Sequence, residues 1–400
     1  MIDFRVDAFI NKNITKRQKS LFSKDILENQ DALTKKINSK NILVIGGAGT
    51  IGSNYIKAIL PYKPKSLTVV DYSENELTEL TRDLRSQELY IPSEYITYPF
   101  DFGSNVFEKL INRNQYDIIA CFAAHKHVRS EKDQLAIEAM INNNVFNTQK
   151  LLELALINKP EHLFSVSTDK AANPVNIMGA SKKLMEKVLM AYSKTLNITT
   201  ARFANVAFSN GSLLYGFIQR IMKRQPLSAP SDVKRYFVSP EESGQLCMIA
   251  SLLGESGDIF FPKLGEEQMM TFSEIAELFL KEIGLTPQYC HSEYEAKELA
   301  SRWEFGYPYP VYFFDSDTSG EKMYEEFFDQ NDTVDWSKFK ELGVVKSSEI
   351  PSIKDVKELI NEFKILLNKN IKKEDIVSLI NHYLPDFSHI ETGKSLDQKM

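Results

Sequence analysis

The feature that most constrains this chain is a glycine-rich turn directly after a short apolar run. The run NILVI is followed by GGAGTIG at residues 46–52. Gly46, Gly49 and Gly52 have the G-x-x-G-x-x-G spacing, and Gly47 opens an overlapping G-x-G-x-x-G frame. Such glycines allow a tight turn, let the backbone approach a pyrophosphate and let the next helix pack close to the strand. The segment therefore predicts a strand–turn–helix that binds a dinucleotide, the alternative being a purely structural turn.

Apolar runs of strand length alternate with amphipathic helical patterns over the first half of the chain. The apolar runs are NILVIGG at 41–47, SLTVVD at 66–71, DIIACFAA at 117–124 and HLFSVST at 162–168. Helical patterns such as SNYIKAIL and ENELTELTRDLRSQ lie between them. This alternation indicates an α/β fold with a Rossmann-type doubly wound parallel sheet, which binds ligands at the carboxyl ends of its strands.

The alternation loosens after about residue 205, which indicates further units. Helical stretches joined by turn-rich pieces predict a smaller C-terminal substrate-binding lobe, and some later segments are expected to return to the sheet domain. Two helical patterns and a loose tail close the chain. The expected divisions are an N-terminal helical strap at 1–40, a dinucleotide-binding Rossmann domain at 41–205, the substrate-binding lobe at 206–349 and a helical extension with tail at 350–400.

Composition narrows the function classes. The 400 residues carry a net charge of −6, with 43% hydrophobic and 26% charged residues, which is the mix of a folded protein. Mild acidity gives no reason to expect nucleic-acid binding. Three widely spaced cysteines fit a reducing compartment and form no metal pattern. No apolar run approaches the roughly 18 residues of a membrane span, and the polar N-terminus is unlike a secretory signal, so a cytoplasmic protein without a membrane span is expected.

Two aspartates lie where the adenosine of a dinucleotide would be expected. Asp71 ends the second apolar run. A carboxylate there accepts hydrogen bonds from ribose hydroxyls and repels a 2′-phosphate, so NAD is favoured over NADP. The alternative is a helix N-cap for the stretch that starts at Ser73. Asp101, in PFDF, is expected to end a strand and contact the adenine, and its alternative is a simple turn.

The segment STDKAANPVNIMGASK concentrates reactive side chains. It places the hydroxyl of Thr168, the carboxylate of Asp169 and the amine of Lys170 at a predicted strand end, just before a helix. Lys182 lies four residues after Met178, so the two share one helix face in a Y-x-x-x-K frame with methionine at the tyrosine position. A thioether has no acidic hydrogen, so another group must take a hydroxyl proton.

These segments together resemble the extended short-chain dehydrogenase/reductase superfamily, and within it the bacterial UDP-N-acetylglucosamine 4,6-dehydratases. The matching segments are GGAGTIGSNY, DYSENEL, FAAHKHV, NNVFNT, STDKAANPVNIMGASK, RFANVAFSNGS, KRYFVSPEE and SGEKMYEEFF. The methionine resembles the branch that retains the C5 configuration. Many members of that branch carry a transmembrane bundle, which this sequence does not show. Thr50 stands where the family often has a Gly-Ser pair.

The resemblance implies a catalytic cycle in which sugar C4 is oxidised, water is eliminated across C5 and C6, and the hydride returns to C6. It implies Lys170 as the C5 base and later acid, which needs a partly neutral amine that burial or a nearby cation would favour. Asp169 would protonate the departing C6 hydroxyl, and Thr168 would bond the C4 oxygen and relay its proton. Lys182 would position the nicotinamide ribose. The final acceptor of the C4 proton stays open.

The resemblance also implies two sets of binding residues. The cofactor set is Gly46, Gly47, Gly49, Thr50, Ile51, Gly52, Asp71, Ser73, Asp101, Phe102, Ala123, Ala124, Asn144, Met178, Lys182 and Val206. The substrate set is Lys126, Asn205, Ser209, Gly211, Ser212, Arg235, Glu321 and Lys322. Arg235 is a candidate diphosphate partner, because guanidinium binds phosphate in a bidentate fashion. Lys126, Glu321 and Lys322 have an ordinary surface role as their alternative. No metal is expected, and His125 and His127 are expected to pack or hydrogen-bond.

The sequence thus predicts an NAD-dependent lyase that converts UDP-N-acetylglucosamine to a UDP-4-keto-6-deoxy-N-acetylhexosamine with retention at C5, for polysaccharide biosynthesis or protein glycosylation. The same reaction on GDP-N-acetylglucosamine, a nucleotide-sugar epimerase and a non-catalytic NAD-binding protein are the alternatives. The missing tyrosine argues against an epimerase, which ordinarily uses one. Relatives form dimers or larger rings, so a homo-oligomer is expected.

Overall fold

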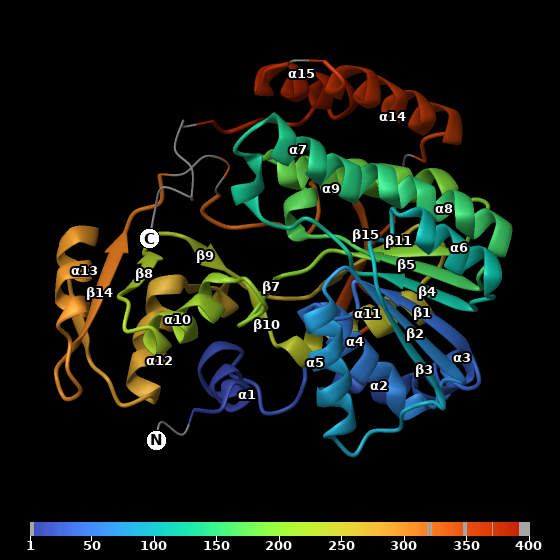
Figure 1. Ribbon diagram of the computed structural model, residues 1–400. Helices are drawn as coiled ribbons and strands as arrows, with labels where there is room; N and C mark the ends of the chain where they lie inside the picture. The colour runs from blue at the N-terminus through green and yellow to red at the C-terminus, as the bar shows by residue number, and fades with distance from the viewer. Residues whose placement is uncertain (1–3, 318–319, 321, 347–349, 370, 392–400) are drawn as a thin grey trace.

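A nine-stranded sheet, counted over the described residues, forms the centre of the molecule (Figure 1). The computed structural model describes residues 4–317, 320, 322–346, 350–369 and 371–391, so the predicted loose tail at 392–400 lies outside it. In spatial order the strands are β15 (Thr333–Asp335), β16 (Leu342–Lys346), β11 (Asp258–Pro262), β6 (Ile198–Ala201), β5 (His162–Val166), β4 (Ile118–Cys121), β1 (Asn41–Ile45), β2 (Ser66–Asp71) and β3 (Glu94–Pro99).

The strands from β11 to β3 run parallel, while β16 and β15 add an antiparallel edge. Ile45, at the end of β1, lies opposite Val70 of β2 and Cys121 of β4. The carboxyl ends of these strands therefore meet at one edge of the sheet. This is the predicted doubly wound Rossmann-type sheet, with the glycine turn and the segment after β5 on the edge where ligands bind.

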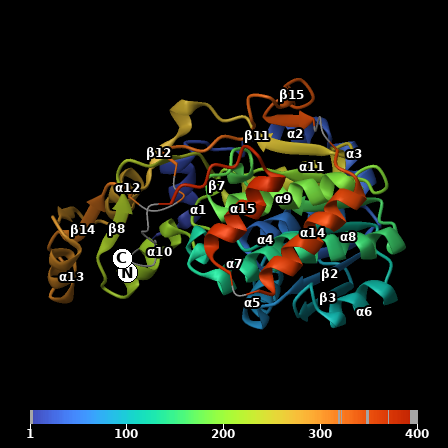
Figure 2. The ribbon, with the colours of Figure 1, turned by 90° about the horizontal axis from the view of Figure 1, so that it is seen from above.

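Helices cover both faces of the sheet (Figures 1 and 2). One face carries α6 (Asn105–Arg113), α7 (Gln134–Ile141), α8 (Asn147–Asn158) and α9 (Ile177–Tyr192), and α14 (Ile353–Leu367) and α15 (Lys373–Tyr383) lie over α9. The other face carries α3 (Gln30–Ile37), α4 (Thr50–Ile59), α5 (Glu74–Arg85) and α11 (Pro240–Leu253). The C-terminal helices are thus an outer layer on the Rossmann unit.

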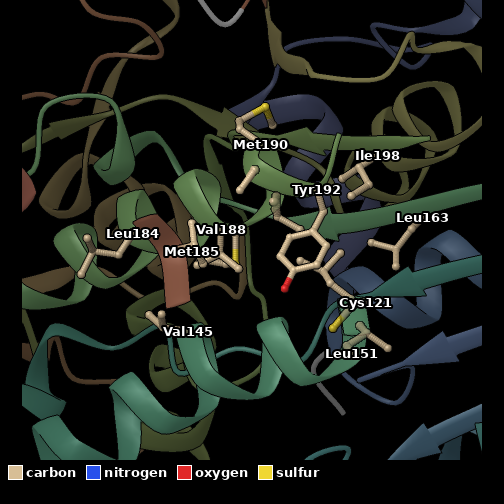
Figure 3. Close-up of a cluster of buried hydrophobic side chains, with 14 of the residues drawn as sticks. Cys121, Val145, Leu151, Leu163, Leu184, Met185, Val188, Met190, Tyr192 and Ile198 are labelled. Atoms are coloured by element: carbon tan, nitrogen blue, oxygen red, sulfur yellow. The ribbon is translucent and has the colours of Figure 1, made fainter. Parts of the chain in front are cut away.

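Helix α9 is buried on nearly every side, because it packs between the sheet and the outer helices. Figure 3 shows Leu184 and Val188 of α9 in the same buried cluster as Leu151 of α8, Cys121 of β4 and Leu163 of β5. All residues of α9 except Lys183 and Lys187 are buried, Lys182 and Glu186 included. The helix that carries Met178 and Lys182 is therefore fixed by packing along its length.

A smaller lobe lies beside the carboxyl edge of the sheet (Figure 1). It contains α10 (Leu213–Met222), α12 (Phe272–Glu282), α13 (Glu293–Ser301) and the parallel sheet of β13 (Pro287–Tyr289), β14 (Tyr309–Phe314) and β8 (Leu227–Pro230). Short pairs join β7 (Asn205–Val206) to β10 (Phe237–Val238) and β9 (Lys234–Arg235) to β12 (Met270–Thr271). Within 206–349, α11, β11, β15 and β16 return to the large sheet, so the lobe is not one continuous stretch.

The N-terminal strap spans both parts of the molecule. Helix α1 (Val6–Phe9) and a π-helical turn at Ile10–Ile14 pack in the lobe, where the ring centroid of Phe9 lies 5.8 Å from that of Phe208. Helices α2 (Ser23–Glu28) and α3 lie against the sheet domain. Between them, Arg17 bonds both carboxylate oxygens of Glu242 at 2.9 Å. The strap therefore connects the lobe to the Rossmann unit at several points.

Strand β3 is the strand that the sequence predicts to end at Asp101. It lies at the sheet edge, and its residues are exposed or half-buried. It ends at Pro99, so Asp101 does not end a strand. Helices α7 and α8 follow one another along the chain and are joined by a π-helical turn at Asn142–Phe146. Among the described residues, no helix is long and apolar enough to cross a membrane.

Candidate active site

The glycine turn is closely packed and leads directly into the N-terminus of α4. Gly46 has φ +71°, and a Cβ there would lie 2.5 Å from the Ala123 nitrogen. A Cβ on Gly52 would lie 2.4 Å from the Gly46 carbonyl oxygen, whereas a Cβ on Gly49 would meet that oxygen only at 3.5 Å. Gly49 is the N-cap of α4, so the helix begins with its unbonded N–H groups at the turn. The geometry fits a dinucleotide pyrophosphate on the turn.

Asp71 orients the glycine turn as well as ending β2. Its carboxylate accepts hydrogen bonds from the backbone nitrogens of Ala48 and Ser73, each at 3.1 Å. Burial raises the pKa of Asp71, and these backbone donors oppose that rise. Ser73, and not Asp71, is the N-cap of α5, since its hydroxyl accepts from the Glu76 nitrogen at 3.4 Å. Asp71 is therefore not the N-cap of α5, which was the alternative role.

Asp101, predicted to contact the adenine, has the geometry of a turn aspartate, which was the alternative. The Asp101 carboxylate accepts from the Gly103 nitrogen at 2.5 Å, as a turn aspartate does. Phe102 is buried, with its ring edge-on to Phe107 at 6.2 Å between centroids. The Phe102 side chain thus serves the core of the Rossmann unit.

Asn144 holds the loop that follows β4. Its side-chain oxygen accepts from the His125 nitrogen at 2.9 Å, while its amide nitrogen donates to the His125 carbonyl and the Ser181 hydroxyl, each at 3.0 Å. The side chain is buried, and its amide is bonded to protein on both ends. Asn144 was predicted to bind the cofactor, but here it positions the segment of Ala123, Ala124 and His125 against α9.

Thr168, Asp169 and Lys170 form one hydrogen-bonded cluster after β5. The Thr168 hydroxyl donates to Asp169 Oδ1 at 2.8 Å, and Lys170 Nζ donates to the same oxygen at 3.1 Å. The three residues open a 3₁₀ turn at Asp169–Ala171, with Thr168 as its N-cap. A Cβ on Gly179 of α9 would lie 2.5 Å from the Lys170 carbonyl oxygen, so the helix and this turn are in close contact.

A buried carboxylate that sequence reasoning missed completes the cluster. Glu325 is 5% exposed, and its Oε1 lies 3.5 Å from Lys170 Nζ. Burial alone would lower the pKa of Lys170, but Asp169 and Glu325 together outweigh it and raise that pKa. The expected partly neutral amine is thus not the resting state, because the neighbours are anions. The signal in the sequence was the glutamate pair Glu325-Glu326 of SGEKMYEEFF, to which no role was assigned.

Lys182 and Met178 lie on α9 as the helical spacing predicts. Lys182 Nζ donates to the Val166 carbonyl at 2.8 Å and contacts Met185 Sδ at 3.1 Å. Burial lowers the pKa of Lys182 to about 8. Met178 is buried, and its backbone nitrogen donates to Glu131 Oε1 at 2.8 Å. No side-chain proton acceptor stands at position 178, as the sequence shows.

The polar turn before α10 is tied to the glycine turn. The Asn210 nitrogen donates to the Thr50 hydroxyl at 2.9 Å, and Lys126 Nζ donates to the Asn210 carbonyl at 3.1 Å. Gly211 has φ +74°, and the Ser212 hydroxyl caps α10 by accepting from Tyr215. The structure therefore brings together the Lys126 loop, this turn and the N-terminus of α4. Ser209 is buried beside them, and Ile51 follows Thr50 in the first turn of α4.

Arg235, the predicted diphosphate partner, bonds protein groups in this structure. It is 5% exposed, its Nη1 donates to the carbonyls of Lys322 and Met323 at 2.9 and 3.2 Å, and its Nη2 lies 3.8 Å from Glu325. The guanidinium thus fixes the segment that carries Glu325. Lys322 Nζ lies 3.9 Å from Glu326. Glu321 lies outside the described residues, and Asn205 and Val206 form β7.

A second missed group lies beneath the cluster. Arg202, 1% exposed, donates to both carboxylate oxygens of Glu186 at 3.0 and 2.9 Å. Ser167 donates to the same carboxylate at 2.6 Å, and Arg202 also donates to the Phe327 carbonyl at 2.9 Å. The network connects β5, α9 and the Glu325 segment. Its members are far apart in the sequence, and no short motif joins them.

The fold and site define a Rossmann-type α/β protein with a dinucleotide turn and a second lobe over the carboxyl edge of the sheet. The chain belongs to the polysaccharide biosynthesis protein family, whose model matches residues 42–347.

The sequences of known proteins that match this chain cover between about half and most of it. An uncharacterized membrane protein of Methanocaldococcus jannaschii is 29% identical over 84% of this chain and 94% of its own length. The inverting UDP-N-acetylglucosamine 4,6-dehydratase of Campylobacter jejuni is 28% identical over 57% of this chain and 68% of its own length. The chain spans only 50% of the probable polysaccharide biosynthesis protein EpsC of Bacillus subtilis, at 26% identity and 79% coverage of this chain.

Epimerases are also among the matches. The UDP-glucose 4-epimerase of Rickettsia rickettsii is 30% identical over 56% of this chain and 66% of its own length.

Among solved structures, Pen from Bacillus thuringiensis matches with a TM-score of 0.64 at 22% identity, covering 88% of this chain and 98% of that one. This similarity supports the fold.

Proposed function

We propose that this chain is an NAD-dependent nucleotide-sugar 4,6-dehydratase that acts on UDP-N-acetylglucosamine with retention at C5. The carrying observation is the hydrogen-bonded series of Thr168, Asp169 and Lys170, next to a methionine where an epimerase would use tyrosine. The family assignment and the dehydratase relative support the proposal. The glycine turn and Asp71 would hold the NAD, and the chemistry that NAD supplies when bound is reversible hydride transfer.

The C4 proton has a path that does not need a tyrosine. As the C4 hydroxyl is oxidised, Thr168 Oγ1 receives its proton while the Thr168 proton passes to Asp169 Oδ1, 2.8 Å away. Asp169 then holds the proton that the departing C6 hydroxyl needs. This path supplies the final acceptor that the sequence left open, and it makes that acceptor the later general acid.

Lys170 completes the elimination. Its neutral amine takes the C5 proton while Asp169 protonates the C6 oxygen, which leaves as water. After hydride addition at C6, the Lys170 ammonium returns its proton to C5. Asp169 and Lys170 thereby end each cycle in the protonation states in which they began, so no external acid or base is consumed.

Product analysis in deuterated water tests this proposal. UDP- and GDP-N-acetylglucosamine are each incubated with the NAD-loaded protein, and the products are examined by NMR and mass spectrometry. We expect a 4-keto-6-deoxy sugar with deuterium at C5 from the UDP sugar. A product that keeps the C6 hydroxyl would contradict dehydration and favour the epimerase alternative, and turnover of only the GDP sugar would correct the nucleotide.

A further inference from the structure

The position of Glu325 calls for a chemical role. Residues 322–327 have no regular secondary structure, yet Glu325 and Phe327 are buried while Tyr324 and Glu326 between and beside them are exposed. The Glu325 carboxylate is held 3.5 Å from the Lys170 amine. Burying a charge costs free energy that pairing only partly offsets, so the buried position of the Glu325 carboxylate lowers the stability of the fold.

Two buried arginines hold this segment. Arg235 donates to the carbonyls of Lys322 and Met323, and Arg202 donates to the carbonyl of Phe327. These anchors lie on either side of Glu325 in the sequence, so they fix its backbone from both directions. Its carboxylate then faces Lys170, with Arg235 Nη2 at 3.8 Å from the same oxygen.

In the proposed reaction, the proton of the resting Lys170 ammonium still needs an acceptor. Lys170 must be a neutral amine before it can take the C5 proton, but its resting form next to two carboxylates is the ammonium. Asp169 cannot keep the extra proton, because it must receive the C4 proton through Thr168. An acceptor for the Lys170 proton is therefore needed within hydrogen-bond reach, in a site that substrate closes to water.

We propose that Glu325 is the proton partner of Lys170, taking the proton of the Lys170 ammonium when the substrate binds and returning it when the product leaves. This inference rests on the proposed function. In the step, the Lys170 Nζ–H bond breaks and a Glu325 Oε1–H bond forms, so an ion pair becomes a neutral amine and a neutral carboxylic acid. No atom or charge enters or leaves the pair.

The surroundings of Glu325 suit a proton that is held only for part of the cycle. Burial raises the pKa of Glu325, the cations Lys170, Arg235 and Lys322 oppose this rise, and the Asp169 carboxylate adds to it. Once Lys170 is neutral, one of the opposing cations is gone and the protonated acid is favoured further. Glu325 acts through Lys170, so it is a positioning and proton-storing residue and not one that contacts the sugar.

The pH dependence of kcat separates proton storage from a structural role. In the unaltered protein the transfer is internal, so kcat should be flat across neutral pH. In Glu325→Gln, Lys170 can lose its proton only to solvent, so kcat should fall about 10²-fold or more at neutral pH and rise about tenfold per pH unit. Glu325→Asp, which keeps a carboxyl group, should retain the flat profile at a lower kcat. Glu326→Gln, the neighbouring exposed carboxylate with the same charge change, should behave like the unaltered protein.

Each outcome decides the inference. A Glu325→Gln variant with a lowered but flat profile, or with full activity, would overturn it, since a structural residue scales kcat at every pH alike. If the Gln variant fails to fold, judged by its circular dichroism, the Asp variant carries the test, and a rising profile there overturns the idea. A second measurement follows the reduction of the nicotinamide in a single turnover. In Glu325→Gln this reduction should still occur, while the entry of deuterium at C5 slows. An unaltered protein that forms no deoxy sugar sinks the proposed function itself and this inference with it.

Discussion

Replacing Gly179 by alanine tests how closely α9 must approach the catalytic turn. The added Cβ would lie 2.5 Å from the Lys170 carbonyl oxygen, closer than real contacts of this kind. Because the obstacle is backbone and α9 is buried along its length, neither side can move without moving the Asp169–Ala171 turn or the helix core. Overpacking of this kind costs about 1–3 kcal/mol. Alanine recovers about 1 kcal/mol of helix propensity, so the net loss of stability should be about 0–2 kcal/mol.

The catalytic effect of Gly179→Ala should exceed its effect on stability. A displacement of the turn by about 1 Å moves the reactive oxygen and amine out of line, and misplacement on that scale costs about 10²-fold in rate. We therefore expect a kcat reduced by about two orders of magnitude in a protein that still folds. Urea denaturation and product formation, measured on the same preparation, give the two quantities.

Gly216 offers a matched control within a second helix. It lies in α10, and a Cβ built there meets no atom within 4 Å. Gly216→Ala should therefore be stabilising by about 0.5–1 kcal/mol, through the propensity difference alone. If Gly179→Ala were as stable and as active as Gly216→Ala, the close approach would have no mechanical importance and the reasoning would be refuted.

Three further predictions follow from buried groups. Glu186→Gln removes the bidentate charge partner of Arg202 and leaves only Asp332, whose Oδ2 lies 3.3 Å from Arg202 Nη1. The free energy of unfolding should therefore fall in a denaturant titration, by less than the about 3–5 kcal/mol of a fully unpaired buried charge. Lys182 has a folded pKa of about 8 against 10.5, so the unfolded state binds more protons between these values and Lys182 should make stability rise with pH there. Lys182→Met should make the pH slope of the urea midpoints less positive, and an unchanged slope would contradict the reasoning. Thr168→Val keeps the shape but removes the proton path, so single-turnover nicotinamide reduction should slow by about 10²- to 10⁴-fold while NAD still binds, and an unchanged rate would exclude the Thr168 relay.

The sheet and its ligand edge could be predicted because their signals are local. Nearly every position of the runs at 41–45, 66–71 and 162–166 is buried, so each run is rich in apolar residues in the sequence. Strand β3 lies at the edge and has a half-exposed pattern, and its end was predicted at Asp101 where the structure has Pro99. The loops after β1 and β5 followed from the strand ends. Local sequence therefore located the reactive turn, because in a parallel sheet the position of a loop is set by the strand before it.

Residues brought in from distant parts of the chain could not be placed in the same way. Arg235 was predicted to bind a diphosphate because a guanidinium binds phosphate well. In the structure its guanidinium donates to backbone carbonyls of the Glu325 segment. Asn144 matched a family segment, yet its amide is bonded to His125 and Ser181. Residue type predicts what a side chain can bind, whereas the partners present in the fold determine what it does bind.

The two halves of the acid–base site have different anchoring, and this has a consequence for the reaction. Asp169 and Lys170 follow β5 and pack on α9, whereas Glu325 is held by Arg235 of β9 in the lobe and by Arg202 after β6. The protonation state of Lys170 therefore depends on how the lobe segment docks on the sheet domain. A change that loosens this docking removes the Glu325 carboxylate, lowers the pKa of Lys170 and exposes its amine to water. In the proposed dehydration, the docking of this segment on the sheet domain is therefore needed for the proton balance, and not only for holding the sugar.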